Sequence, residues 1–575
     1  MYYAMDPQQE YVYQAWEIFR CCLLRTLMSY RGSAGPSGAE PLPDLATAPP
    51  EVSSDGRTWT FHLRRGLHYA PPLQRTEITA PDVVRALMRA GDKKTGGLGP
   101  SFYLGVIQGF AAYQNGKSPT ISGLETPNNF TLRVREVHPD GSLPYLFAFP
   151  LSAPIPPLPG SPDARFGVAT GHPFTGDPST GYGHYLVASG PYMFAGSGAL
   201  NFSAPARKQR PVSGFRAETD KRSGFIHLVR NPSWDRSTDP LRAALANQIR
   251  IDVGDPAKWF HRFEQGRLDM VLSESPPPSM LRRYEQSPTL RGRIQTTDGN
   301  GEIYAFLNVA QPPFDDEAIR WAFAQALDRA AIVRSVGPNF GEVPYTVADH
   351  LAPDPTEGGL LSTWNPFSPP NGHGNVRAAR TTMGSSRYAR NGRCVGPSCR
   401  HVVVLIDDGV ARAALPVKRA LHALGIRPTV HVVDDTSRCD DPSQHIAVCI
   451  GNGWFADFPN GANFLDFFFN SDGLASGVRD SSLLGASSAQ LAGWGYSARS
   501  VPDVDAELNR CVATVGSNQP ACWAQVDQLL MTRVVPAVPI VSFQPVRILG
   551  PRISRFSWDE AYVEPALDRI AVSGR

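Results

Sequence analysis

The feature that most constrains the fold is a strand–helix–strand pattern in the second half of the chain. The apolar run 401–406 precedes a helical pattern over 411–424 and a strand-like run over 428–433. Because parallel strands need a crossover connection of this kind, the pattern predicts a parallel α/β sheet with a right-handed crossover. A third strand-like run, 445–450, leads directly into residues 451–457. In open α/β sheets, ligands gather beyond the carboxyl ends of the strands, so residues 451–457 are a candidate binding loop.

Regular elements are also indicated earlier in the chain. Apolar and polar residues alternate over Thr58–Arg64, which predicts a strand with one buried face. Thr79 and Asp82 have the spacing of a capping box, so a helix is expected over 80–90. A further helix is expected after Asp316, where apolar residues recur with helical spacing. Its buried face would comprise Ile319, Ala322, Phe323, Ala326 and Leu327.

Length and charge exclude several classes of protein. Hydrophobic residues make up 42% of the 575 residues, which is enough for folded cores. Since a typical domain has roughly 150 residues, a chain of this length is expected to contain about four domains. The net charge is only +2 and there is no basic block, so nothing indicates nucleic-acid binding. No apolar stretch approaches the roughly 18 residues of a membrane-spanning helix.

The cysteines indicate an oxidising compartment. Six of the eight fall in close pairs, namely Cys394 with Cys399, Cys439 with Cys449, and Cys511 with Cys522. None of these pairs has the spacing of a zinc site, and short local loops suit disulfides. Free thiols are the alternative. Disulfides persist outside the cytoplasm, so an extracytoplasmic protein is expected.

The adjacent pair Cys21-Cys22 is interpreted differently. An Arg precedes it and no apolar signal region precedes the Arg, so it is no lipoprotein processing site. The two residues are expected to be buried, small apolar side chains on a helix. If the protein is exported, its signal segment is missing from this chain.

The sequence lacks several motifs that mark known catalytic and metal sites. It contains no H-E-x-x-H, G-x-S-x-G or D-F-G motif. Gly116-Lys117-Ser118 lacks the first glycine of a phosphate loop, so it is interpreted as an exposed turn. Asp457, Asn460, Asn463 and Asp466 recur every three residues, but the spacing and final Glu of a calcium loop are missing. No metal or cofactor is therefore expected.

Motifs in sequence order resemble one protein family along nearly the whole chain. They are Asp6-Pro7, the stretches 43–66 and 79–84, Gly190-Pro191-Tyr192, Arg230-Asn231-Pro232 and the stretch 308–329. Together they are similar to the peptide-binding (oligopeptide and dipeptide) class of extracytoplasmic solute-binding proteins, which serve ABC-type importers. Any one motif is weak, but their order makes the resemblance specific.

The resemblance implies an α/β fold of two lobes, like that of periplasmic binding proteins, with a two-strand hinge. It also implies an additional inserted α+β domain. Lobe I is expected at 1–42, 190–300 and 544–575, the inserted domain at 43–189, and lobe II at 301–543.

The resemblance also implies a binding site. A Trp-x-Ala-Asp motif in lobe II supplies the carboxylate that pairs with the α-ammonium group of a peptide, and Trp454-Phe455-Ala456-Asp457 matches this motif. A carboxylate in a closed cleft suits a free amino terminus, because it forms charge-assisted hydrogen bonds. Further expected ligand contacts are Phe455, Asn452, Tyr11, Tyr13 and Tyr304. For the tyrosines, core packing is the alternative.

The function implied is a non-enzymatic receptor. It would capture short peptides between its lobes and deliver them to a membrane-embedded ABC permease. The protein is expected to be an extracytoplasmic monomer, with a lipid anchor in the precursor as one form of attachment. One alternative is the same scaffold binding an oligosaccharide, a metal chelate or a non-ribosomal peptide. Two others are a hydrolase that uses Asp457 and Asp466, and a structural or adhesive surface protein.

Overall fold

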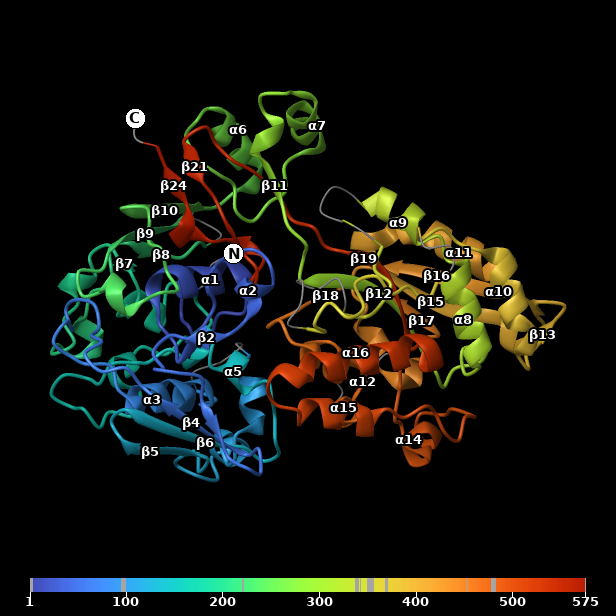
Figure 1. The fold of residues 1–575 in the computed structure, drawn as a ribbon, viewed down its shortest axis with the longest axis horizontal. Coiled ribbons are helices and arrows are strands. Elements are labelled where there is room, and N and C mark those ends of the chain that lie inside the picture. Colours follow the sequence, from blue (N-terminus) through green and yellow to red (C-terminus); the bar gives the residue numbers. More distant parts are fainter. Residues whose placement is uncertain are drawn as a thin grey trace. The chain divides into compact units, whose positions relative to one another are not determined.

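The chain folds into two compact units (Figure 1). The first comprises Met1–Gln295 and Arg547–Arg575, and the second comprises Thr296–Val546. The computed structural model describes residues 4–94, 100–219, 222–336, 341, 343–348, 356–367, 371–451, 453–476 and 482–573. None of the helices in this described part is long and apolar enough to span a membrane.

A six-stranded mixed sheet forms the centre of the second unit. Its strands are β12 (Gly301–Leu307), β15 (Arg400–Asp407), β16 (Arg427–Val433), β17 (Val448–Ile450), β18 (Trp454–Phe455) and β19 (Ala537–Ser542). The order is β16-β15-β17-β12-β18, and β19 also pairs with β12. β15 is parallel to β16 and β17, and α11 (Ala414–Ala423) connects β15 to β16. The predicted strand–helix–strand unit is therefore confirmed.

Two groups of helices pack in this unit (Figure 1). One group contains α8 (Glu317–Ala326), α9 (Arg329–Val336), α10 (Val376–Thr382) and α11. The other contains α12 (Leu465–Phe469), α15 (Asp505–Val512) and α16 (Gln519–Leu529). Asp316 caps α8 through hydrogen bonds from the amides of Ala318 and Ile319, and all five predicted core residues of this helix are buried. The smaller elements are α13 (Asp472–Ser476), α14 (Ser488–Gly493), β13 (Ala389–Arg390) and β14 (Arg393–Cys394).

The first unit contains two four-stranded antiparallel sheets. One has the order β3-β4-β6-β5, with β3 (Glu51–Val52), β4 (Thr58–His62), β5 (Leu124–Asn128) and β6 (Thr131–Arg135). The other is formed by β7 (Tyr192–Phe194), β8 (Phe215–Arg216), β9 (Gly224–Arg230) and β10 (Gln248–Val253). β4 and α3 (Ala80–Ala90) confirm the predicted strand and helix, and the Thr79–Asp82 capping box is present.

Shorter elements complete the first unit. Its other helices are α1 (Tyr13–Ile18), α2 (Pro36–Ala39), α4 (Phe110–Gln114), α5 (Leu143–Leu146), α6 (Trp259–Glu264) and α7 (Pro278–Gln286). Short strand pairs are β1 (Met28–Ser29) with β2 (Leu42–Pro43), β21 (Ile553–Arg555) with β24 (Ala571–Val572), and β22 (Trp558–Asp559) with β23 (Glu564–Pro565). The carboxylate of Asp6 forms two hydrogen bonds of 2.6 Å with the guanidinium of Arg89, so this buried pair fixes the amino-terminal segment against α3.

The chain passes twice between the two units. β11 (Ile294–Thr296) and β20 (Val546–Ile548) lie at these two passages and form a two-stranded sheet. The placement of a separate inserted domain at 43–189, within the first unit, stays a prediction.

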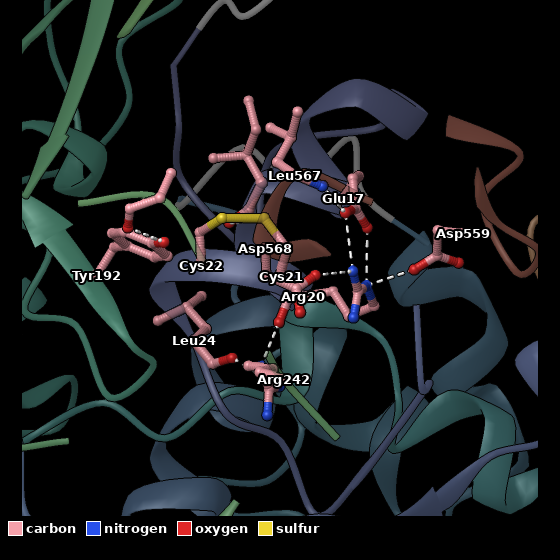
Figure 2. Close-up of a disulfide and its surroundings, with 12 residues drawn as sticks. Glu17, Arg20, Cys21, Cys22, Leu24, Tyr192, Arg242, Asp559, Leu567 and Asp568 are labelled. Carbon is pink, nitrogen blue, oxygen red and sulfur yellow. Dashed lines mark hydrogen bonds and ion pairs between the residues drawn. A yellow bond between two sulfur atoms is a disulfide. The ribbon is translucent and has the colours of Figure 1, made fainter. Parts of the chain in front are cut away.

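Disulfides join all eight cysteines. The three expected pairs are bonded, Cys394 to Cys399, Cys439 to Cys449, and Cys511 to Cys522. The interpretation of Cys21 and Cys22 as separate apolar side chains is wrong, because their sulfur atoms are bonded to each other at 2.08 Å (Figure 2). Both are fully buried, as expected, but they lie in a π-helical turn over Phe19–Leu23. Adjacent cysteines close no loop between them, so an argument from loop spacing does not detect such a bond.

Candidate functional site

Residues Trp454–Asp457 lie at an edge of the sheet in the second unit. β18 pairs antiparallel with the beginning of β12, with Trp454 opposite Glu302 and Phe455 opposite Gly301. The amide of Ala456 donates a hydrogen bond of 2.7 Å to the carbonyl oxygen of Asn300. Main-chain hydrogen bonds to β12 and Asn300 therefore fix the motif as far as Ala456. Asp457 is the first residue beyond this paired segment.

A register shift separates β17 from β18 along the same edge of β12. Cys449 and Trp454 are five positions apart, whereas their partners Phe306 and Glu302 are only four apart. The pairing register with β12 therefore differs by one residue between the two strands. Gly453 has a φ of +93°, and a Cβ atom there would lie 2.6 Å from the carbonyl oxygen of Glu302. The backbone that leads into Trp454 therefore requires glycine at position 453.

Two asparagines hold the loop that follows Asp457. The amide of Asp457 donates to the side-chain oxygen of Asn463 at 2.7 Å, and the amide of Ala462 donates to that of Asn460 at 2.9 Å. The side-chain amide of Asn460 also donates to Gln519 on α16 at 2.9 Å. These oxygens, considered above as part of a calcium pattern, bind the chain's own amides. Asp457 itself is only 3% exposed, which places its carboxyl group in a shielded environment.

Half-buried aromatic rings surround the motif. The ring of Trp454 stacks on Phe467 with a centroid distance of 4.3 Å, and its indole N–H donates to the carbonyl oxygen of Asn463 at 3.1 Å. Phe455 lies 4.2 Å from Phe543, measured between ring centroids. The loop thus combines an acidic residue with several partly accessible apolar faces.

Tyr304 does not belong to this surface, so its prediction as a ligand contact is wrong. Its side chain is 2% exposed, and its hydroxyl donates to the carbonyl oxygen of Val347 at 2.6 Å. Burial raises the pKa of Tyr304 well above its ordinary value. The buried ring and the inward hydrogen bond place Tyr304 in the core of the second unit, which was the alternative for this residue.

Ionised and ionisable groups are also buried near Tyr304. Arg329 donates from Nη1 to the carbonyl oxygens of Pro344 and Pro539, and burial lowers the pKa of its guanidinium to about 10. The carboxyl group of Asp527, on α16, accepts hydrogen bonds from the amides of Val347 and Ala348. Burial raises the pKa of Asp527 to about 6. These hydrogen bonds fix the segment that covers Tyr304.

The other predicted contacts are placed as follows. Tyr11 and Tyr13 belong to the first unit, where both half-buried rings pack edge-on against Trp16 at centroid distances of 5.4 and 5.3 Å. Because Asp457 belongs to the second unit, a site shared by all three stays a prediction. Asn452 lies outside the described residues.

Sequence reasoning missed Asn463, Phe467 and Phe543 as parts of the site. In the sequence, Asn463 stands out only as one of the polar residues that recur every three positions from Asp457, a pattern that resembles a metal site. The structure gives that spacing another meaning, because a short loop returns Asn463 to the amide of Asp457.

A family model and several curated proteins match this chain. The model of "Bacterial extracellular solute-binding proteins, family 5 Middle" matches residues 40–476. The periplasmic oligopeptide-binding protein OppA of Salmonella typhimurium is 25% identical over 328 residues, which cover 56% of this chain and 51% of that protein. The oligopeptide-binding protein OppA of Bacillus subtilis is 25% identical over 309 residues, which cover 52% and 48%. The chain thus spans about half the length of the curated relatives it matches.

Solved structures share the fold. "Clavulanic acid biosynthesis oligopeptide binding protein 2" superposes with a TM-score of 0.74 and 23% identity, covering 99% of this chain and 93% of that one. The complex of Haemophilus influenzae OppA with the peptide RPPGFSPFR has a TM-score of 0.57 and 18% identity, covering 99% and 96%. These similarities confirm the predicted fold class, the two-lobed α/β fold of periplasmic binding proteins.

Proposed function

We propose that this chain, which belongs to family 5 of the bacterial extracellular solute-binding proteins, captures short peptides and delivers them to an ABC-type importer. Proteins of this family bind solutes and are not catalysts. The names of the relatives, which describe oligopeptide binding, support a peptide as the solute. The observation that carries the proposal is the position of Asp457, a shielded acidic residue directly after a strand in the matching Trp454–Asp457 motif.

Asp457 would recognise the amino terminus of the peptide. All linear peptides with a free amino terminus carry an α-ammonium group, and a shielded carboxylate binds such a group through charge-assisted hydrogen bonds. The rest of an extended peptide can be held by main-chain hydrogen bonds, which do not depend on its sequence. Trp454 and Phe455 would contact the first side chains, and we assign Asn452, Tyr11 and Tyr13 to the same site as further contacts.

Binding would shift the protein from an open to a closed population. A ligand that contacts both units only in the closed state favours that state by its differential affinity. β11 and β20 would act as the hinge, because they carry the two passages of the chain between the units. The closed form would then be recognised by the membrane-embedded permease.

Four disulfides support an extracytoplasmic location, since such bonds persist in oxidising compartments. We propose that the mature protein works there as a monomer, with a lipid anchor in the precursor as one means of attachment.

Native mass spectrometry of protein purified without denaturation tests the peptide proposal. The expected result is a set of adducts that dissociate as peptides and that added tri- to pentapeptides displace. Adducts that only oligosaccharides or metal chelates displace would contradict the proposal and favour the same scaffold with another solute. Protein that is free of adducts and unaffected by any added peptide would also contradict it.

A further inference from the structure

A basic pocket opens in the first unit where α3 and α4 end. We use this name for the cavity of about 710 Å³ lined by Lys93, Lys94, Lys117 and Arg165, among other residues. It shares no residue with the Trp454–Asp457 motif. Its volume lies within the range of small-molecule sites, roughly 300–1,000 Å³.

Lysine is concentrated in this pocket. The chain has 48 Arg but only seven Lys, and three of the seven line the basic pocket. Lys93 and Lys94 follow α3, whereas Lys117 follows α4, so the ammonium groups come from separate segments of the chain. The fold therefore gathers a scarce residue type at one concave surface.

The positive charge of the pocket is not neutralised within the described part of the chain. Asp92 is the acidic residue among the described lining, and its carboxylate pairs with Arg165 at 3.2 Å. No ion pair between described residues involves Lys93, Lys94 or Lys117, and the Lys93 ammonium donates only to the neutral side-chain oxygen of Asn115, at 2.9 Å. By contrast, Lys258 in the same unit pairs with Asp255 at 3.1 Å. Three ammonium charges thus remain available to an anion.

One wall of the pocket is held in place by a buried tyrosine. Tyr113 is 3% exposed, and its hydroxyl donates to the carbonyl oxygen of Met88 at 2.7 Å. The same hydroxyl accepts a hydrogen bond of 2.8 Å from Arg165, whose guanidinium lies 5.1 Å from the centre of the Tyr113 ring. Arg165 is therefore fixed by Asp92 and Tyr113, while the three lysines can adapt to a ligand.

We propose that the basic pocket binds a phosphate monoester, either on a soluble molecule or on the headgroup of a monoester phospholipid such as phosphatidic acid. A phosphate monoester carries about 1.5 to 2 negative charges near neutral pH and three acceptor oxygens, so it can bridge several ammonium groups. A single carboxylate, with one charge, would satisfy fewer of them. Lysine binds phosphate as a point charge and does not need the fixed geometry of arginine. The cavity leaves room for the group that bears the phosphate.

The binding differs from that of a phosphate loop. Ala111 stands where such a loop would need its first glycine, and the amide of Lys117 donates a hydrogen bond of 2.8 Å to the carbonyl oxygen of Ala112. Side-chain ammonium groups, and not backbone amides, would hold the phosphate.

Calorimetric titration of the full chain tests this proposal. The probes are inorganic phosphate, glycerol 3-phosphate, and phosphatidylcholine vesicles with and without phosphatidic acid. The test variant combines Lys93→Ala, Lys94→Ala and Lys117→Ala. Its matched control combines Arg207→Ala, Lys208→Ala and Arg210→Ala, which removes the same number of exposed charges from the same unit. Circular dichroism checks the fold of both, and the single variant Lys117→Glu serves if the triple variant does not fold.

We expect the test variant to lose about tenfold or more in affinity while the control binds as the native chain does. Binding of the soluble phosphates without vesicle binding assigns the pocket to a soluble ligand. Binding only of vesicles that contain phosphatidic acid assigns it to a lipid headgroup. Absence of binding for every probe overturns the proposal, as does an equal loss of affinity in both triple variants, since general surface charge would then explain the result.

Discussion

The backbone N–H of Asp457 donates a hydrogen bond to the side-chain oxygen of Asn463, which lies 2.7 Å away. The carbonyl oxygen of Asn463 accepts the indole N–H of Trp454 at 3.1 Å. Asn463 therefore connects both ends of the Trp454–Asp457 motif. In the proposed site it positions the carboxylate without contributing charge.

Replacing Asn463 should weaken peptide binding while leaving Asp457 in place. Asn463→Ala removes the acceptor of a buried amide, a loss that costs about 1–3 kcal/mol. We expect the affinity for a free tripeptide to fall about tenfold, with the preference for a free amino terminus retained. Calorimetry measures both quantities. The exposed Asn509, on α15, provides the control Asn509→Ala, and equal affinities of the two variants would contradict the positioning role.

A buried cation stabilises the first unit. Arg20 contacts Glu17 at 2.7 Å, Asp559 at 2.5 Å and Asp568 at 3.0 Å, and all four side chains are almost completely buried (Figure 2). Burial disfavours the charged guanidinium, but the carboxylates of Asp559, Glu17 and Asp568 outweigh this effect and hold the pKa of Arg20 above its ordinary value.

Arg20→Met should therefore be strongly destabilising, because it leaves buried carboxylates without a counter-ion. We expect a loss of about 3–5 kcal/mol in the free energy of unfolding, measured by guanidinium denaturation. The matched control is Arg133→Met, since Arg133 forms an exposed pair with Glu125 at 4.0 Å and should contribute only about 0–1 kcal/mol. A loss of similar size in both variants would be inconsistent with this account.

The disulfide between Cys511 and Cys522 should stabilise the second unit by joining α15 to α16. It closes a loop with a sequence separation of 11, for which the chain-entropy relation gives about 2–3 kcal/mol. The double variant Cys511→Ala/Cys522→Ala should lose this amount in urea denaturation. Cys394→Ala/Cys399→Ala removes a bond with a separation of only 5 and should lose less. The reverse order would show that loop closure does not govern these bonds.

Glu136 should make the stability of the protein depend on pH. Its carboxylate accepts hydrogen bonds from the indole N–H of Trp59 and the amide of Asp140. Burial, followed by the nearby charge of Asp140, raises the pKa of Glu136 to about 8 from an ordinary value of 4.5.

The folded protein then binds a proton at Glu136 that the unfolded chain has lost over this range. Stability should therefore fall as the pH rises from about 4.5 to about 8, by at most about 1.4 kcal/mol per pH unit. Glu136→Gln keeps a neutral acceptor and should make the decrease smaller. Thermal unfolding of both proteins from pH 5 to pH 8 measures the difference, and parallel curves would refute the assignment to Glu136.

The elements whose apolar residues recur at a regular spacing could be predicted from the sequence. The strand–helix–strand unit and α8 were predictable because their apolar residues have a clear period. Tyr304 was not predictable, because Ile303, Ala305 and Leu307 are also apolar and both faces of β12 are buried. A continuous apolar run carries no information about which face a residue occupies.

The site was predictable only in part for a similar reason. Asp457 could be placed at the end of a strand by its motif. The hydrogen bond of Asn463 depends on how the intervening loop closes, and periodicity does not describe loop closure. The bond between Cys21 and Cys22 depends likewise on a local π-helical turn that no sequence pattern indicated.

The most direct test of peptide capture through Asp457 is a calorimetric comparison of one tetrapeptide with a free and with an acetylated amino terminus. We expect acetylation to weaken binding to the native chain about a hundredfold, because losing one partner of a shielded charge pair costs about 2–5 kcal/mol. Asp457→Asn should bind the two forms with equal, low affinity. Equal binding of both forms by the native chain would contradict the account.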